Sequence, residues 1–128
     1  MTVLPITSIF VAAACVMLVG LSLPVSLKRV SLKAPAGDAG DETLRRRIRA
    51  QGNFIEYAPL GLLALALIEF GGAGSTTVWG IGGGLAIGRV LHAIGMWADI
   101  TAGKALGTLL TYLALLASAI SLAMLVAG

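Results

Sequence analysis

Charged and amide side chains follow one face of a long apolar segment and offer groups that could bind a ligand. Glu42, Arg46, Arg49, Asn53 and Glu56 recur at spacings of four, three, four and three, which places them along one helical seam. Glu42 and Arg46 at the segment's start fit either local ion pairs in the head-group layer or a binding role. Asn53 and Glu56 lie deeper and cannot snorkel to water as Lys or Arg can, so they require polar partners.

A second polar pair occurs in the third apolar run. Arg89 and His92 are three residues apart and therefore share one helical face. Arg89 is the basic residue deepest within an apolar run, and Glu56 is its obvious partner, within one subunit or between subunits. His92 fits either a ligand-binding role or a satisfied structural histidine.

The fourth run begins with Lys104 and continues with Thr108, Thr111 and Tyr112. Lys104 fits an interfacial anchor as well as a functional cation. Threonines in membrane helices commonly bond to the preceding turn, so Thr108 and Thr111 are weak indicators of a site. Together, the basic groups of the second, third and fourth runs predict a cationic cluster that would attract an anionic, amphipathic ligand.

The elements that must position these groups are four membrane-spanning helices. The chain has 128 residues, 58% of them hydrophobic, and a mean hydropathy of +0.97, which leaves too little polar surface for a soluble globule. Spans of about 20 residues are needed to cross a hydrocarbon core roughly 30 Å thick. We predict one all-α domain over residues 1–128, a polytopic four-helix bundle with spans at 6–27, 42–70, 76–97 and 104–127. The first run lacks a basic leader, which argues against a cleaved signal peptide.

The distribution of basic residues predicts the orientation. All nine Lys and Arg residues fall on one side of the implied bilayer, around the first loop or toward the second. By the positive-inside rule the basic loops are cytoplasmic and both termini lie on the outer side. Membrane lipids are expected partners, and nucleic acid is not, because no aromatic-interleaved basic surface lies outside the membrane zone. Cys15 lies within an apolar span and has no second cysteine to pair with. We expect no metal site.

Local signals mark the ends and contacts of the spans. Asp41 is a plausible N-cap of the second span, and the glycine-rich stretch 71–75 predicts a tight turn. Pro59 removes a helical hydrogen bond near Glu56. The stripe of Gly80, Gly84 and Gly88 allows close helix approach, either inside the bundle or between subunits.

The segment from Arg49 to Pro59, with the sequence RAQGNFIEYAP, resembles the second-helix signature of the membrane-associated proteins in eicosanoid and glutathione metabolism, the MAPEG family. Arg89-x-x-His92 resembles the third-helix motif of the same family. The resemblance implies a homotrimer of four-helix subunits that binds glutathione between neighbours at the cytoplasmic end. It implies glutathione contacts for Arg49, Asn53, Glu56, Tyr57, Arg89 and His92.

Two positions depart from the family pattern. Met96 stands where family enzymes often have Tyr, and Lys104 stands near the fourth-helix Arg that enzymes of the leukotriene C and prostaglandin E type carry. We expect Lys104 to stabilise the glutathione thiolate as a point charge. The predicted function is glutathione transfer or peroxidase chemistry on lipophilic electrophiles or lipid hydroperoxides. A non-catalytic lipid-binding or scaffold protein of the same fold is the alternative. A small proton-coupled multidrug transporter fits less well, because the first span has no acidic residue.

Overall fold

The chain folds into four long helices, and the structure describes residues 3–128. In this computed structural model, α1 spans Pro5–Leu32, α2 spans Glu42–Phe70, α3 spans Ser75–Trp97 and α4 spans Thr101–Ala127. Each predicted span lies within one of these helices. Even α3, with 23 residues, is roughly 35 Å long at about 1.5 Å per residue, and all four helices are long and apolar enough to cross a bilayer. The all-α, four-helix prediction is confirmed.

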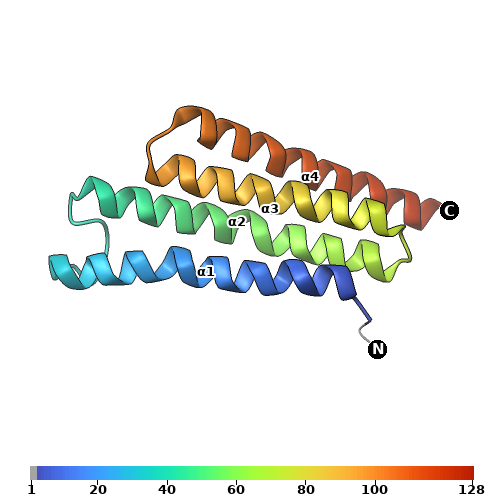
Figure 1. Cartoon of the computed structure of the whole chain (residues 1–128), viewed down its shortest axis with the longest axis horizontal. Helices are drawn as coiled ribbons and strands as arrows, with labels where there is room; N and C mark the ends of the chain where they lie inside the picture. Colours follow the sequence, from blue (N-terminus) through green and yellow to red (C-terminus); the bar gives the residue numbers. More distant parts are fainter. Residues whose placement is uncertain (1–2) are drawn as a thin grey trace.

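The helices form an open bundle with α2 and α3 at its centre. Within residues 3–128, α1 packs mainly on α2, α4 packs mainly on α3, and α1 does not touch α4. Figure 1 shows α1 and α4 on opposite sides of the α2–α3 pair. It also shows that α1 begins and α4 ends at the same end of the bundle, which we call the terminal end. The opposite end carries the α1–α2 and α3–α4 loops, and we call it the basic end.

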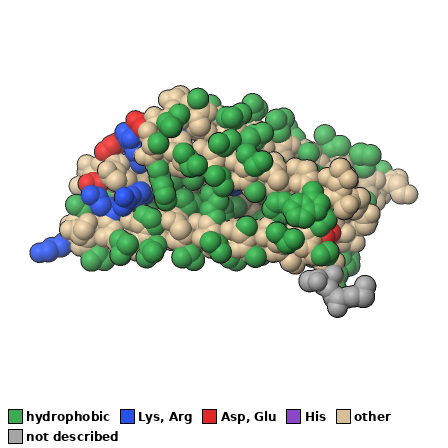
Figure 2. All heavy atoms as spheres, in the orientation of Figure 1, with side chains coloured by type: hydrophobic (Ala, Val, Ile, Leu, Met, Phe, Trp, Pro, Cys, Tyr) green, Lys and Arg blue, Asp and Glu red, His purple; other side chains and the backbone are tan. Residues whose placement is uncertain are grey.

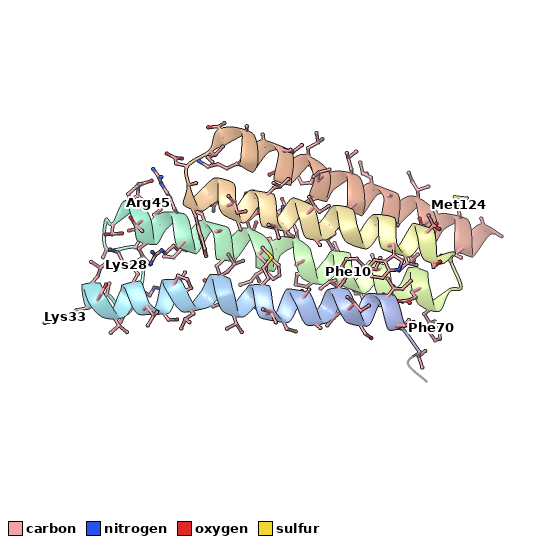
Figure 3. The ribbon with its side chains drawn as sticks, in the orientation of Figure 1. Phe10, Lys28, Lys33, Arg45, Phe70 and Met124 are labelled. Carbon is pink, nitrogen blue, oxygen red and sulfur yellow. The ribbon has the colours of Figure 1, made fainter. Side chains whose placement is uncertain are left out.

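Charged side chains gather at the basic end, as the charge distribution predicts. Figure 2 shows Lys, Arg and most of the visible acidic side chains there, while hydrophobic side chains cover much of the rest of the visible face. In Figure 3, Lys28, Lys33 and Arg45 lie at the basic end, whereas Phe70 and Met124 lie toward the terminal end. Large hydrophobic residues are exposed on all four helices, as expected for surfaces that face lipid.

Two groups of buried apolar residues hold α1 against the α2–α3 pair. One contains Leu21, Ala50, Phe54, Ala58 and Ala93. The other contains Leu65, Ile68, Val78 and Ile81, with Ile6 and Phe10 of α1 packed against it. These contacts fix the rotation of α2 and α3, and that rotation decides which polar side chains face each other.

Glycines bring α3 and α4 together so closely that the backbones touch. A methyl group added at Gly95 would lie 2.5 Å from the Lys104 amide nitrogen, and one at Gly107 would lie 2.6 Å from the Gly88 carbonyl oxygen. Side chains larger than hydrogen cannot fit at such contacts. The predicted stripe therefore packs inside the bundle at Gly88, whereas Gly80 faces open space.

Acidic side chains cap two of the helices. Asp41 is the N-cap of α2, as predicted, and its carboxylate accepts a hydrogen bond from the Leu44 amide at 2.7 Å. At the terminal end, the Glu69 carboxylate of α2 accepts hydrogen bonds from the amides of Ile6 at 2.9 Å and Thr7 at 2.7 Å. The first amides of a helix have no partner within it, so Glu69 satisfies the start of α1. The predicted turn after α2 is also confirmed, because α2 ends at Phe70 and α3 begins at Ser75.

Candidate functional site

Arg89 lies at the centre of a polar cluster between α2, α3 and α4. Only 4% of Arg89 is exposed. Its Nε and Nη2 atoms donate to the Thr111 hydroxyl at 2.9 and 2.6 Å, and Nη2 also reaches the Gly107 carbonyl oxygen at 3.5 Å. Its Nη1 atom donates to the side-chain oxygen of Asn53 and, at 3.2 Å, to the Asn53 carbonyl oxygen. Arg89 thus connects the three helices through neutral oxygen atoms.

Two tyrosines extend this cluster toward the surface between α2 and α4. The Arg89 guanidinium carbon lies 5.3 Å from the centre of the Tyr57 ring, within the range of a cation–π contact. The Tyr57 hydroxyl lies 3.3 Å from the Tyr112 hydroxyl, so one donates to the other. Tyr57 is half-buried and Tyr112 is exposed. The tyrosine pair therefore forms the outer wall of the polar cluster.

The predicted ion pair between Arg89 and Glu56 is absent within one chain. Among residues 3–128 no carboxylate lies within salt-bridge distance of Arg89. Glu56 is exposed on α2 instead. At 3.6 residues per helical turn, Glu56 lies about 60° around α2 from Asn53, and Asn53 occupies the position facing Arg89. The prediction of an Arg89–Glu56 pair inside the subunit is wrong, and pairing between subunits stays a prediction.

A shallow recess on α4 opens beside the tyrosine pair. Its volume is about 470 Å³, and its lining includes Lys104, Thr108 and Tyr112 at successive turns of the helix. The Thr108 hydroxyl donates to the Lys104 carbonyl oxygen at 2.9 Å, as expected for a membrane threonine. The recess thus has a cation at the basic end and a tyrosine hydroxyl toward the middle of the bilayer.

Lys104 takes part in an ion network at the basic end. Its ammonium lies 2.6 Å from one Asp99 carboxylate oxygen, and Arg46 lies 2.8 Å from the other. The hydrogen bond from Lys104, and then the charge of Arg46, hold the pKa of Asp99 below its usual value. Arg46 also pairs with Glu42 at 3.0 Å, so these two residues form the local ion pair that is one of the two roles open to them from the sequence. Asp99 therefore offsets part of the positive charge at the recess.

The remaining predicted site residues flank this cluster. His92 is buried, one turn from Arg89 on α3, with its backbone against Gly107 of α4. Arg49 is exposed on α2, one turn before Asn53. The structure thus brings Asn53, Tyr57 and Arg89 into direct contact. His92 lies one turn further along α3, toward α4. Lys104 lies at the basic end of the recess, and Arg49 and Glu56 lie on the outer surface of α2.

Three residues of the site are not among the predicted site residues. Thr111 and Tyr112 are noted in the sequence as polar residues of the fourth run without a role in the site, and Asp99 is not noted at all. Thr111 is fully buried and accepts from Arg89, while its own hydroxyl donates to the Gly107 carbonyl oxygen at 2.8 Å. Tyr112 completes the tyrosine pair. Asp99 pairs with Lys104. A sequence pattern could have indicated Asp99, because it is an acidic residue two positions before a helix that has a basic residue in its first turn.

Comparison with known proteins matches most of the chain to one protein family. The model of the MAPEG family matches residues 7–124. Two curated relatives, from Escherichia coli strain K12 and from Escherichia coli O6:H1 strain CFT073, both carry the name inner membrane protein YecN. Each is 27% identical over 111 residues, which cover 87% of this chain and 85% of the relative. No solved structure gives a significant match. The four apolar helices and these relatives indicate an integral, multi-pass membrane protein.

Proposed function

The chain belongs to the MAPEG family, and from that premise we propose that it binds glutathione within the membrane. We further propose that it transfers glutathione to lipophilic electrophiles, or uses it to reduce lipid hydroperoxides. The family likeness supplies the ligand class, and the site supplies a reason why an anionic tripeptide would bind there.

The observation that carries this proposal is the charge of Arg89. The guanidinium is buried among three helices, and all of its hydrogen-bond partners are neutral. A buried charge without a counter-ion is costly in a medium of low dielectric constant. A carboxylate of glutathione beside Arg89 and Asn53 would supply the missing negative charge, and it would reach them past the tyrosine pair.

The exposed polar residues of α2 support assembly as a homotrimer. Arg49 and Glu56 lie on the outer surface of an isolated chain, where a bilayer would leave them without partners. A neighbouring subunit would cover them, and bound glutathione would then contact Arg49, Glu56 and His92 together with the Arg89 cluster. In this arrangement the basic end is cytoplasmic and both termini lie on the outer side.

The chemistry would begin with the glutathione thiol near Lys104. A pKa lowered by about two units would raise the thiolate fraction at pH 7 by nearly 100-fold, which corresponds to roughly 2.7 kcal/mol. The thiolate attacks the electrophilic carbon, a carbon–sulfur bond forms, and the leaving group departs with the bonding electrons. The thiol proton passes to water. With a hydroperoxide, two glutathione molecules become the disulfide while the peroxide becomes an alcohol and water.

Calorimetry with glutathione on protein purified in neutral detergent tests the binding step. We expect saturable heat for the wild type and its loss in Arg89→Gln, with Arg45→Gln as a matched control, because Arg45 is exposed and pairs with Asp38 and Glu42. Absence of heat and of thermal stabilisation at millimolar glutathione would refute binding. Wild-type affinity in Arg89→Gln would show that Arg89 does not hold the ligand.

Conjugation of a model aryl halide tests the catalytic step. Replacing Lys104 by Ala should leave glutathione binding largely intact and abolish conjugation. An unchanged conjugation rate would remove Lys104 from the mechanism.

A non-catalytic binding protein is the second candidate, favoured by the ion pair between Asp99 and Lys104. If that pair persists with ligand bound, less charge is left to stabilise a thiolate. Glutathione binding without turnover of several electrophiles would identify this function, whereas turnover would exclude it.

A further inference from the structure

A long apolar groove lies between α1 and α3, on the side of the α2–α3 pair away from α4. Its volume is about 640 Å³, and Gly20, Leu21, Ala86, Ala93 and Trp97 are among its lining residues. Small side chains leave this space open. Gly20 in particular has no neighbouring atom within 4 Å of where a side chain would begin.

Phe10 closes the groove toward the terminal end of the bundle. Its ring occupies the position that a side chain at Gly82 would take, and it packs edge-on against Trp79 at 5.3 Å between ring centres. The label in Figure 3 places Phe10 on the terminal-end half of α1. From Phe10 to Leu21 the lining of α1 is roughly 16 Å long at about 1.5 Å per residue. Half of a hydrocarbon core is about 15 Å thick, so the groove has the length of one lipid chain.

A smaller, more polar cavity lies next to the groove, toward the basic end. Its volume is about 210 Å³, it is lined by Pro24, Thr43, Arg46, Arg47 and Trp97, and it shares Trp97 with the groove. Arg46 is neutralised by its carboxylate partners. Arg47 is not, because its one hydrogen bond, at 3.2 Å, goes to the Pro24 carbonyl oxygen, and no carboxylate within residues 3–128 pairs with it.

We propose that these two neighbouring cavities bind one anionic glycerophospholipid, with an acyl chain between α1 and α3 and its phosphate at Arg47. An apolar channel of one-leaflet length that ends at a tryptophan and an unpaired arginine matches a lipid's order of chain, ester region and phosphate. The cavities lie on the opposite side of α3 from the α4 recess. The groove borders the polar cluster at one residue, because Arg89 is among its lining residues. The variants below change no residue of the Arg89 cluster or of the α4 recess, so the lipid site and the proposed glutathione function can fail separately.

Fluorescence quenching measures occupancy of this site directly. Trp97 is observed in a Trp79→Phe background, which removes the other tryptophan of the chain and keeps an aromatic ring against Phe10. The protein in neutral detergent is titrated with phosphatidylglycerol carrying a brominated chain, and with phosphatidylcholine carrying the same chain. We expect saturable quenching by both lipids and at least a fivefold preference for phosphatidylglycerol, since one basic residue at a membrane surface is worth about that factor.

Two kinds of substitution separate the contact with the lipid head group from the contact with the acyl chain. Arg47→Gln should weaken phosphatidylglycerol binding about fivefold and remove the preference over phosphatidylcholine. Gly20→Leu should fill the groove and weaken both lipids at least tenfold, with Ala13→Leu, another lining position, as a second way to fill it. The matched controls are Arg45→Gln, outside the small cavity, and Gly80→Leu, where a new side chain meets open space outside the groove.

Three outcomes would overturn the proposal. Equal losses in Arg45→Gln and Arg47→Gln would show that the preference comes from general surface charge. Wild-type quenching in both groove-filling variants would place the lipid elsewhere. If those variants change the oligomeric mass in detergent and leave quenching unaltered, the groove is a contact between copies of the chain.

Discussion

Replacing Thr111 by Val tests whether Arg89 holds the three helices together. Valine has nearly the same shape, so the substitution removes one hydroxyl and creates no cavity. It removes the hydrogen bonds that Nε and Nη2 of Arg89 donate at 2.9 and 2.6 Å, leaving a charged group partly unsatisfied. Hydrogen bonds to charged groups contribute about 1.5–3 kcal/mol, whereas polar contacts between membrane helices average about 0.6 kcal/mol. Because Thr111 is fully buried and its partner is charged, we expect the larger range.

The assay is equilibrium unfolding in mixed micelles, followed by circular dichroism. A loss of about 1.5–3 kcal/mol corresponds to roughly 10- to 150-fold in the unfolding constant. Thr108→Val is the matched control, because the Thr108 hydroxyl bonds only to the preceding turn of its own helix. Equal losses of unfolding free energy in the two variants would refute the reasoning. The hydrogen bonds from Arg89 to Thr111 would then contribute nothing beyond what a threonine bonded only to its own helix contributes.

Three further changes probe other contacts. Glu69→Gln should lower stability by about 1–2 kcal/mol, measured by thermal unfolding, because the start of α1 loses a charged cap. Gly107→Ala should destabilise the protein more than Gly80→Ala does, because its methyl group meets the α3 backbone. Asp99→Asn should free Lys104 and make the thiol of bound glutathione more acidic, read from thiolate absorbance against pH. In the wild type, the pKa of Asp99 is lowered in the folded state. Its ion pairs therefore stabilise the fold at pH values above the usual aspartate pKa, and this stabilisation is lost as the pH falls through the folded-state pKa. NMR titration of the Asp99 carboxylate measures that pKa.

The helices were predictable because hydropathy and turn residues act locally. Asp41 at the start of α2 and the glycines after Phe70 mark ends that the structure reproduces. The partner of Arg89 depended on helix rotation, which periodicity leaves open by tens of degrees. Asn53 and Glu56 share a seam in the sequence, yet packing of Ala50 and Phe54 against α1 turns Asn53 inward and leaves Glu56 outside.

Contacts made by backbone atoms were harder to foresee. The Glu69 carboxylate accepts hydrogen bonds from two backbone amides of α1. Every residue except proline has a backbone amide, so the sequence does not show which amides a carboxylate will bind. The sequence indicates the glycine stripe that ends at Gly88. It does not indicate that Gly103 and Gly107 of α4 lie against α3, because that contact depends on how α4 packs. Thr111 counts as a weak indicator in the sequence because membrane threonines commonly bond to their own helix. It does so, but its hydroxyl also accepts from Arg89, and residue spacing does not reveal this second bond.

The cap on α1 also has a consequence for biosynthesis. The two amides at the start of the first helix bond to a carboxylate that lies 63 and 62 residues later in the chain. While the ribosome is still making the second helix, those amides must stay hydrated at the bilayer surface. The Glu69 cap therefore forms only after the second helix has been made and lies beside the first, so these hydrogen bonds hold the start of the first helix only in the completed hairpin of the two helices.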